Sequence, residues 1–365
     1  MKIKHFIIPA LLLLFILYSI SSPAFASLKN KQEGQESDII IIPEKVKSIF
    51  QEGIETREAR LDIPFSIIWH VYLPAQQNMH CIFYFKVKNT DLGFSPITPA
   101  AEIPEKKEEK EKEETPELEP EIVPTILQAS GHVFLQFNRL ENNTPKEVVK
   151  EVYIPINLEA DSTSYQPDKE ELYSTAYPLP SGNYLLSMAL ASLDMEKIGT
   201  QYFEFSLPDS LSYTEELGTT PVFLAREIKR IPSPETTAEV HKEFFSYSVL
   251  QITPNMENFF SVGDNLDIFF FIFGAMPTEE GKFDIDVNYE VFKGEERVIQ
   301  YATAHYDAPI ISQPLPMKKT VVIKSEEGEK KEQRDLEPGN YTLQISIEDK
   351  VSGNSVKKSI DFDVK

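Results

Sequence analysis

Histidines and paired carboxylates are the side chains of this chain that could do chemistry. His70 and His80 could face each other across a β-hairpin, a geometry that can bind zinc. Two strand-like stretches each carry two carboxylates on one face, namely Asp284 and Asp286, and Asp361 and Asp363. Such pairs hydrolyse glycosides only where they flank a cleft and one of them is desolvated. Both pairs lie opposite an apolar strand face, so we expect them in solvent, and we expect the histidines at the surface or at a core edge.

The chain lacks the short motifs of common catalytic and nucleotide-binding sites. G-x-S-x-G, G-x-G-x-x-G, the P-loop and H-E-x-x-H are all absent. Cys81 is the sole cysteine, which excludes an intramolecular disulfide and a thiolate zinc cluster, and its apolar neighbours favour a buried residue over a reactive thiol. We therefore expect no enzyme, no cofactor and no bound metal. A hydrolase with unrecognised carboxylates is the weakest alternative.

The best candidate for ligand contact is a long connection over residues 161–179. It carries Tyr165, Tyr173 and Tyr177 among polar residues and has no strand periodicity. Tyrosine on a loop offers a broad contact area with few rotamers to immobilise, so binding loops favour it. The alternative is that these rings pack back onto the protein, as aromatic rings often do.

The N-terminal stretch has the three parts of a secretory signal. Two early lysines precede an apolar run over residues 6–20, and Ala24 with Ala26 forms an A-x-A cleavage pattern. We expect cleavage after Ala26, a signal peptide over residues 1–26 and a mature protein in the periplasm or outside the cell. The alternative is an uncleaved membrane anchor, but the run is short for a span of about 20 residues.

The charge and hydropathy of the chain limit its partners. The formal net charge is −22, from 58 acidic and 36 basic residues. Such a chain is repelled by nucleic acid and by anionic lipid surfaces. There is no second long apolar stretch, so we expect no transmembrane span in the mature chain. The expected partner is another envelope or secreted protein.

An internal repeat at an offset of 157 residues is the most informative pattern. Leu179-Pro-Ser-Gly-Asn-Tyr184 matches Leu336-Glu-Pro-Gly-Asn-Tyr341. After each tyrosine, apolar and polar residues alternate, and a second alternating stretch follows in each copy, over 203–207 and 360–364. Period-two alternation predicts strands with one buried face. Each copy is therefore predicted to end in a β-hairpin.

Further short strands fill both halves of the chain. They are predicted over residues 67–73, 81–87, 133–137, 149–156, 266–273, 283–291 and 298–301. Many short strands at this spacing predict an all-β sandwich class. The one helix predicted spans Val46 to Ile54, although Gly53 weakens it.

Composition divides the chain into segments. We expect an N-terminal extension over 27–60, a first domain over 61–208, a linker over 209–219 and a second domain over 220–365. The stretch 102–121 is rich in Glu and Lys, so we predict a disordered insertion over about 97–125 of the first domain. The charged stretch 325–335 is predicted to be a disordered loop for the same reason.

The L-x-P-G-N-Y run with its following strands resembles the E–F corner of immunoglobulin and fibronectin type III sandwiches. The resemblance implies two tandem antiparallel sandwiches of that type, in which Tyr184 and Tyr341 hydrogen-bond back to the corner backbone. The second half also carries Phe223-Leu-Ala-Arg-Glu-Ile-Lys-Arg230, Ile252-Thr-Pro254 and Phe260-Ser-Val-Gly-Asp-Asn-Leu266 before its P-G-N-Y ending. With these motifs, residues 220–365 are similar to the Ig-like regions of bacterial envelope proteins that carry a GWxTD domain. No GWxTD segment occurs in this chain, so nothing about the role of that domain transfers.

These expectations favour a non-catalytic exported protein that acts through Ig-like domains as a protein–protein interaction or structural module. A carbohydrate-binding module is the alternative, since sandwiches with aromatic loops often bind sugars. Trp69 is the only tryptophan and lies in a predicted strand, which argues against that alternative.

Overall fold

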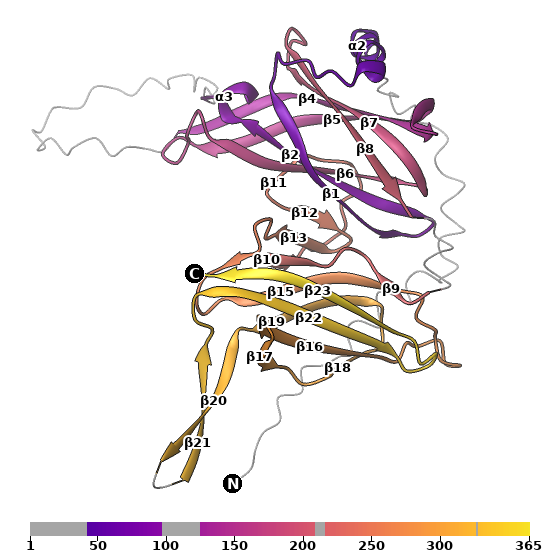
Figure 1. Ribbon diagram of the computed structural model, residues 1–365. Helices are drawn as coiled ribbons and strands as arrows, with labels where there is room; N and C mark the ends of the chain where they lie inside the picture. The colour runs from indigo at the N-terminus through magenta and orange to yellow at the C-terminus, as the bar shows by residue number, and fades with distance from the viewer. Residues whose placement is uncertain (1–41, 97–124, 209–215, 326–327) are drawn as a thin grey trace, which may run out of the picture. The chain divides into compact units, whose positions relative to one another are not determined.

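The computed structural model describes residues 42–96, 125–208, 216–325 and 328–365. Strands dominate these residues, and the helices among them are α2 (Glu44–Thr56) and the short α3 (Asn89–Leu92). Figure 1 shows these elements along the chain. The predicted all-β class is confirmed. The predicted signal peptide and the insertion over 102–121 lie outside the described residues.

The first sandwich is built from two antiparallel sheets. One sheet has the order β1-β2-β6, and the other has the order β5-β4-β7-β8, with β3 on the start of β4. Their bounds are β1 (Phe65–Ala75), β2 (Asn78–Lys88), β3 (Ser95–Pro96), β4 (Ile126–Glu141), β5 (Thr144–Asp161), β6 (Glu170–Leu179), β7 (Gly182–Ser192) and β8 (Ile198–Leu207). Alternate residues of both sheets face one core, as Phe83 and Phe85 do from β2 and Leu135 and Phe137 do from β4. Period-two burial therefore fixes which face of each strand packs inward.

The second sandwich repeats this plan. One sheet has the order β12-β13-β10-β15-β19, and the other has the order β14-β23-β22-β16-β17. The bounds are β9 (Gly218–Thr219), β10 (Phe223–Arg230), β12 (Phe245–Tyr247), β13 (Leu250–Pro254), β14 (Phe259–Phe260), β15 (Asn265–Phe273), β16 (Ile285–Lys293), β17 (Glu296–Gln300), β18 (Ala304–Tyr306), β19 (Ile310–Pro316), β22 (Gly339–Asp349) and β23 (Ser355–Val364). All pairings in it are antiparallel except that of β14 with β23. Its core lies between the two sheets and contains Tyr289, Leu343 and Phe362.

The repeated hairpins β7–β8 and β22–β23 match in register as well as in sequence. Tyr184 pairs with Phe205 and Tyr341 pairs with Phe362, so the offset of 157 residues holds on both strands. The rings of each pair are stacked, with centroids 5.4 Å and 5.6 Å apart. The Tyr184 ring belongs to the first core and the Tyr341 ring to the second.

Each of these tyrosines is held by two contacts, one at its hydroxyl and one at its ring. Tyr184 Oη donates a hydrogen bond to Pro180 O at 2.8 Å, and Tyr341 Oη donates one to Glu337 O at 2.6 Å. A cation covers each ring, 5.2 Å from the centroid for Arg139 Cζ over Tyr184 and 5.4 Å for Lys293 Nζ over Tyr341. The two corners therefore share a backbone anchor and a cation–π contact.

The glycine of each repeat makes room for its cation. Gly182 and Gly339 both have positive φ, 146° and 153°. A Cβ at Gly182 would collide with the Arg139 guanidinium, and one at Gly339 would lie 3.3 Å from Lys293 Nζ. The backbone angle therefore favours glycine at both positions, and at Gly182 the missing Cβ also leaves space for the guanidinium.

A third buried cluster joins the two sandwiches. It is made of side chains from β1 and β2 on one side and from β10, β12, β13 and β15 on the other: Val71, Leu73, Ile82, Tyr84, Phe223, Ala225, Phe245, Ile252 and Phe269. We call it the shared core. It explains why β2 is apolar on both faces, since Phe83 faces the first core while its neighbour Tyr84 faces the shared core.

The segment between β10 and β13 also pairs with the first sandwich. Its strand β11 (His241–Lys242) extends the first sandwich by antiparallel pairing with Ser174 and Tyr173 of β6. Ser174 Oγ donates to Phe244 O at 2.5 Å, and Tyr247 Oη donates to Pro74 O at 2.5 Å. We call residues 231–247 the strap.

The predicted helix is confirmed and covers the outer face of the β4–β7–β8 sheet. Val46 and Phe50 of α2 are buried against Phe134, Ala189 and Ile198. The apolar residues whose spacing predicted the helix lie on one face of α2, and this face packs inward.

Two predictions of irregular structure are wrong. Residues 325–335 were expected to form a disordered loop, but β20 (Lys318–Ser325) and β21 (Gly328–Asp335) pair with each other over their full length (Figure 1). The two strands are held by continuous backbone pairing, and Lys318 lies 3.8 Å from Asp335 across them. A composition argument does not detect such pairing.

The connection expected over residues 161–179 is also shorter than predicted. β5 extends to Asp161 and β6 begins at Glu170, so only residues 162–169 connect them. The strand escaped detection because both faces of β6 are covered, and the polar side chains of Ser174 and Thr175 are fully buried among the apolar ones. Without a wet face there is no period-two contrast in the sequence.

Candidate functional site

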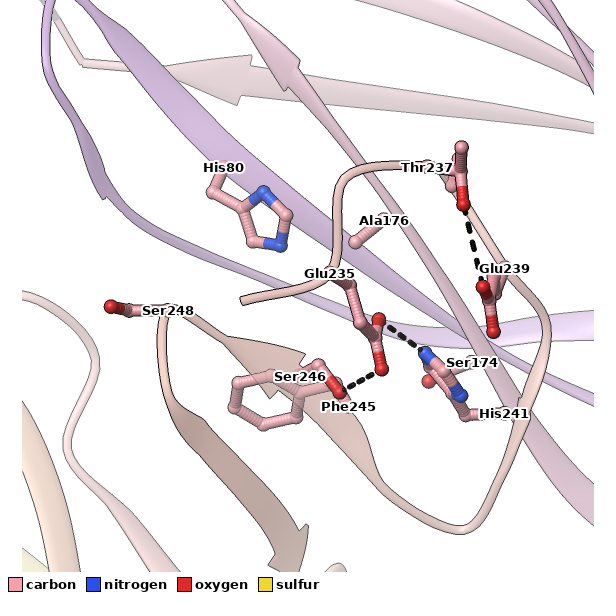
Figure 2. A pocket seen from close by; sticks show the side chains of 11 residues that line it. His80, Ser174, Ala176, Glu235, Thr237, Glu239, His241, Phe245, Ser246 and Ser248 are labelled. Atoms are coloured by element: carbon pink, nitrogen blue, oxygen red, sulfur yellow. Dashed lines mark hydrogen bonds and ion pairs between the residues drawn. The ribbon is translucent and has the colours of Figure 1, made fainter. Parts of the chain in front are cut away.

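The candidate site is a small cavity where the strap meets the first sandwich. The cavity has a volume of about 80 Å³. Its walls come from β2, β6, the strap before β11, and β12, and Figure 2 shows the side chains that line it. The polar residues among them are His80, Ser174, Glu235, Thr237, Glu239, His241, Ser246 and Ser248.

Pairing of β11 with β6 places His241 in the cavity wall. His241 is the register partner of Ser174, and its ring stacks on Phe244 with centroids 4.6 Å apart. Its side chain is 12 % exposed. The imidazole is therefore held by a strand on one side and by an aromatic ring on the other.

Glu235 and Glu239 bring two carboxylates to the same place. Glu235 Oε2 lies 2.9 Å from His241 Nε2, and Glu235 Oε1 accepts a hydrogen bond from Ser246 Oγ at 2.6 Å. Glu239 Oε1 accepts one from Thr237 Oγ1 at 3.3 Å. Glu235, Glu239 and His241 each offer a ligand atom within 4.8 Å of the other two.

His80 contributes a second imidazole from β2. Its Nε2 atom is buried and has no hydrogen-bond partner among the described residues. Figure 2 shows the ring of His80 at the edge of the same cavity, on the side of Glu235. Burial lowers the pKa of His80, so its imidazole is neutral at pH 7 and offers a lone pair.

This arrangement suits binding better than nucleophilic catalysis. Ser246 Oγ donates to Glu235, and Ser174 Oγ donates to a backbone oxygen, so neither hydroxyl is directed at an imidazole base. Nucleophilic catalysis needs the nucleophile within hydrogen-bond reach of its base. Glu235, Glu239 and His241, in contrast, bring an imidazole and two carboxylates together, and these groups bind ions and polar ligands.

The zinc geometry considered for His70 with His80 does not form. In the β1–β2 register His70 pairs with Phe83, whose ring lies in the first core, while His80 pairs with Leu73, which lies in the shared core. Register partners share a face of the sheet, so the two imidazoles lie on opposite faces. His70 instead packs on Phe205, with ring centroids 5.3 Å apart.

The two carboxylate pairs are engaged in local contacts. Asp361 accepts a hydrogen bond from Thr342 Oγ1 at 2.7 Å, and Asp363 accepts one from Asn340 Nδ2. Asp286 pairs with His305, and Asp284 is exposed. None of these four carboxylates lines the small cavity between the strap and the first sandwich.

The three tyrosines proposed for ligand contact do not form one surface. Tyr173 is 1 % exposed and belongs to the first core, so its assignment to a binding loop is wrong. Tyr177 stacks on Phe137 with centroids 6.2 Å apart, and Tyr165 contacts Phe94 at 5.5 Å. Tyr173 and Tyr177 pack onto the sandwich because they lie on β6, a largely buried strand, and Tyr165 packs on Phe94 from the short connection before it.

Sequence reasoning missed the site that the structure assembles. The spacing Glu235-x3-Glu239-x-His241 is visible in the strap and could have been noted as a partial ligand set. His80 lies far away in the chain, and only the β6–β11 pairing brings it to the same cavity. Cys81, expected to be buried and inert, is fully buried, and burial raises the pKa of its thiol.

No protein-family model and no curated protein matches this chain. None of the helices in the described residues is long and apolar enough to cross a membrane.

Proposed function

We propose that this chain is a non-catalytic exported protein, and that two Ig-like sandwiches joined at the shared core act together as a protein-interaction or structural module. The shared core is the observation that carries the proposal. It buries Tyr84, Phe245 and Phe269, which would be exposed aromatic side chains if the two sandwiches were separate.

Strand order supports the Ig-like assignment. In immunoglobulin and fibronectin type III sandwiches, strands A, B and E form one sheet, and G, F, C and C′ form the other. The orders β1-β2-β6 and β8-β7-β4-β5 fit this arrangement, and so do β10-β15-β19 and β23-β22-β16-β17. The anchored Tyr184 and Tyr341 stand at the start of the strands that would be F.

The strap supports a fixed rather than a flexible connection between the sandwiches. Lys242 of β11 lies 3.3 Å from Glu171, a carboxylate of β6 whose side chain is only 7 % exposed. Glu243 N donates to Leu172 O at 2.9 Å. Strand pairing, a partly buried ion pair and the shared core therefore connect the two sandwiches. Two sandwiches connected in this way would keep their binding surfaces at a fixed spacing.

The carbohydrate-binding alternative is weakened by the place of Trp69. Its ring packs against Tyr84 and Phe223, with centroids 5.5 Å and 6.3 Å apart. A sugar platform requires an aromatic face open to solvent, whereas Trp69 contributes to the edge of the shared core.

Export is tested by sequencing the N-terminus of the protein recovered from its native host. The proposal predicts a periplasmic or secreted protein that begins at Ser27. Recovery of a cytoplasmic protein that retains residues 1–26 would contradict it.

Interaction is tested by native affinity purification of the exported protein from the envelope, with a glycan array in parallel. We expect one protein to co-purify in a fixed ratio, and no saturable glycan binding. The carbohydrate-binding alternative would be established if no protein co-purifies and the chain binds a glycan that the Trp69→Ala variant does not bind.

A further inference from the structure

We propose that the hairpin of β20 and β21 joins two copies of this chain, through antiparallel pairing of β21 with β21 of the second copy. We call this hairpin, residues 318–325 and 328–335, the arm. The inference goes beyond the function proposed above and does not rest on export or on the shared core, because it concerns one edge of the arm alone.

The arm is a sheet of two strands without a packed face. Among the described strands, β20 and β21 pair only with each other. Met317 and Leu336, at the base of the arm, belong to the second core, whereas Val321 and Val322 belong to none of the buried clusters of the described residues. Figure 1 shows both strands running beyond the sheets of the second sandwich. A two-stranded sheet is only marginally stable in water, so further strands would stabilise the arm.

The backbone of β21 leaves a row of groups open for pairing. Leu336 N donates to Met317 O at 3.0 Å, so Leu336 bonds toward the β20 side. In an antiparallel ladder without a bulge this direction alternates from residue to residue, so the N–H and C=O groups of Lys331, Gln333 and Asp335 point to the opposite edge. No described strand pairs with that edge. Such an edge is a template for a strand of another chain.

The charges along β21 are complementary to their own reverse order. The strand reads Lys331-Glu332-Gln333-Arg334-Asp335. If Gln333 lies opposite Gln333 of the second copy, then Glu332 lies opposite Arg334 and Lys331 lies opposite Asp335, each twice by symmetry. Unlike charges that face each other across strands stabilise a sheet, and like charges destabilise it. In this register every charged residue of the run meets an unlike charge, and the open backbone groups of both strands meet as well.

Symmetry selects this register over its neighbours. A two-fold axis normal to a sheet keeps each side chain on its own face, so one residue of the strand must lie opposite its own copy. Gln333 is the only uncharged residue between Glu329 and Asp335. Any other residue of this run on the axis would therefore place like charges face to face.

The contacts that these charges make within one chain are weak. Arg334 Nη2 lies 3.5 Å from Glu332 Oε2, with side chains 53 % and 44 % exposed, and Lys318 Nζ lies 3.8 Å from Asp335 Oδ1. Exposed ion pairs of this kind contribute little to stability. The side chains can therefore turn to a second copy at low cost.

The first test measures self-association of the full chain by sedimentation equilibrium, at concentrations up to about 1 mM. We expect a reversible dimer with a dissociation constant above about 1 μM, because pairing of one short strand from each copy buries less than the about 1,000 Å² of a stable interface. Glu332→Arg and Arg334→Glu should each raise this constant at least about tenfold, since two attractive pairs become repulsive.

Glu227→Arg is the matched control. Glu227 is 50 % exposed on β10 and pairs with Lys229 two residues later, as Glu332 does with Arg334. This variant should associate as the unchanged chain does. A chain that stays monomeric at the highest concentration, or a control that loses association equally, would overturn the proposal.

The second test mixes the two charge variants in equal amounts. Glu332→Arg and Arg334→Glu should associate with each other as the unchanged chain associates with itself. The introduced arginine then faces the introduced glutamate, and the original pair remains on the other side of the axis. A chain that carries both substitutions should dimerise for the same reason. Absence of recovery in the mixture and in the double variant would overturn the proposal.

The third test locates the axis by cross-linking. In Gln333→Cys the two Cα atoms would lie about 5.5 Å apart, within reach of a disulfide, so a mild oxidant should link two chains. In Lys331→Cys the two Cα atoms would lie more than about 13 Å apart, so no link should form. Cys81 is fully buried and stays out of the reaction. Linking of both variants at one rate, or of neither, would overturn the proposal.

Discussion

Two tyrosines at equivalent positions show how much of this fold is set by single residues. Tyr184 and Tyr341 each stack on an aromatic partner, lie under a cation and donate a hydrogen bond to a carbonyl four residues earlier. The motif resemblance predicted the hydrogen bond, because the tyrosine and the carbonyl that accepts it lie close together in sequence, but it did not predict the stacked ring or the cation. Tyr173 was not predictable in the same way, since its burial depends on strands far from it in the chain.

Removing the corner hydroxyl should cost stability. Tyr341→Phe keeps the stacked ring but loses the hydrogen bond to Glu337 O, so the free energy of unfolding should fall by about 1 kcal/mol. Urea unfolding followed by circular dichroism measures the change.

Tyr84→Phe is the matched control. Tyr84 is fully buried in the shared core, and its hydroxyl has no hydrogen-bond partner among the described residues. Removing a buried hydroxyl without a partner should leave stability equal or higher. If Tyr341→Phe and Tyr84→Phe change stability alike, the corner hydrogen bond does not have the role assigned to it.

Glu171, at the contact between the strap and β6, should make the stability of the protein depend on pH. Burial alone would raise the pKa of this carboxyl, but Lys169 and Lys242, at 3.0 Å and 3.3 Å, outweigh it and hold the pKa below its ordinary value. A lowered pKa in the folded state means that the ionised carboxylate stabilises the protein above the unfolded pKa of about 4.3. That stability is lost as the pH falls through the folded value.

Glu171→Gln should therefore destabilise the protein near pH 7 and make progressively less difference below about pH 4. Thermal melting of both proteins across this range measures the effect. Its exposed neighbour provides the control, since Glu170→Gln should match the unchanged chain at every pH. A Glu171→Gln deficit that is constant with pH would show that the charge is not responsible.

At the scale of elements, periodicity predicted those strands that have one wet face and failed for the others. β16 and β22 alternate cleanly, and their bounds were close to prediction. β6 was missed because both its faces are buried, and β21 was missed because almost all its side chains are charged or polar. Register and pairing partners were beyond prediction, apart from the repeated hairpins.

Helix α2 contains a glycine that lowers its helix propensity, and the packing of the helix explains why the glycine is there. Gly53 lowers helix propensity, yet it is buried and leaves space for the ring of Tyr202, whose hydroxyl donates to Ile49 O at 3.3 Å. A Cβ at position 53 would collide with that ring. The glycine therefore permits the close approach of α2 to β8.

Gly53→Ala should loosen α2, even though alanine favours an isolated helix by about 1 kcal/mol. Hydrogen exchange over residues 44–56 should become faster in this variant. Adding Tyr202→Ala should bring the exchange rate back toward that of Tyr202→Ala alone, because the collision is gone. Slower exchange in Gly53→Ala would show that propensity, not packing, governs this position.

At the scale of the whole molecule, the shared core is the feature that the sequence did not predict. The sequence predicts two domains with a linker between them. Two of the three main cores agree with this prediction, because one lies in each predicted domain. The third needs apolar residues on the second face of β2 and on β12, which appear in sequence as ordinary strand residues. The small cavity follows the same logic, since His80 and His241 line it together only after the strap has paired with β6.

The distance between spin labels at Lys146 and Lys358, in a Cys81→Ala background, tests most directly whether the sandwiches are joined as one body. Both lysines are exposed, and they lie on β5 and β23. We predict a single narrow distance distribution in pulsed dipolar spectroscopy, and a broader one after Phe245→Ala opens a cavity in the shared core. A broad distribution with Phe245 in place would contradict the account.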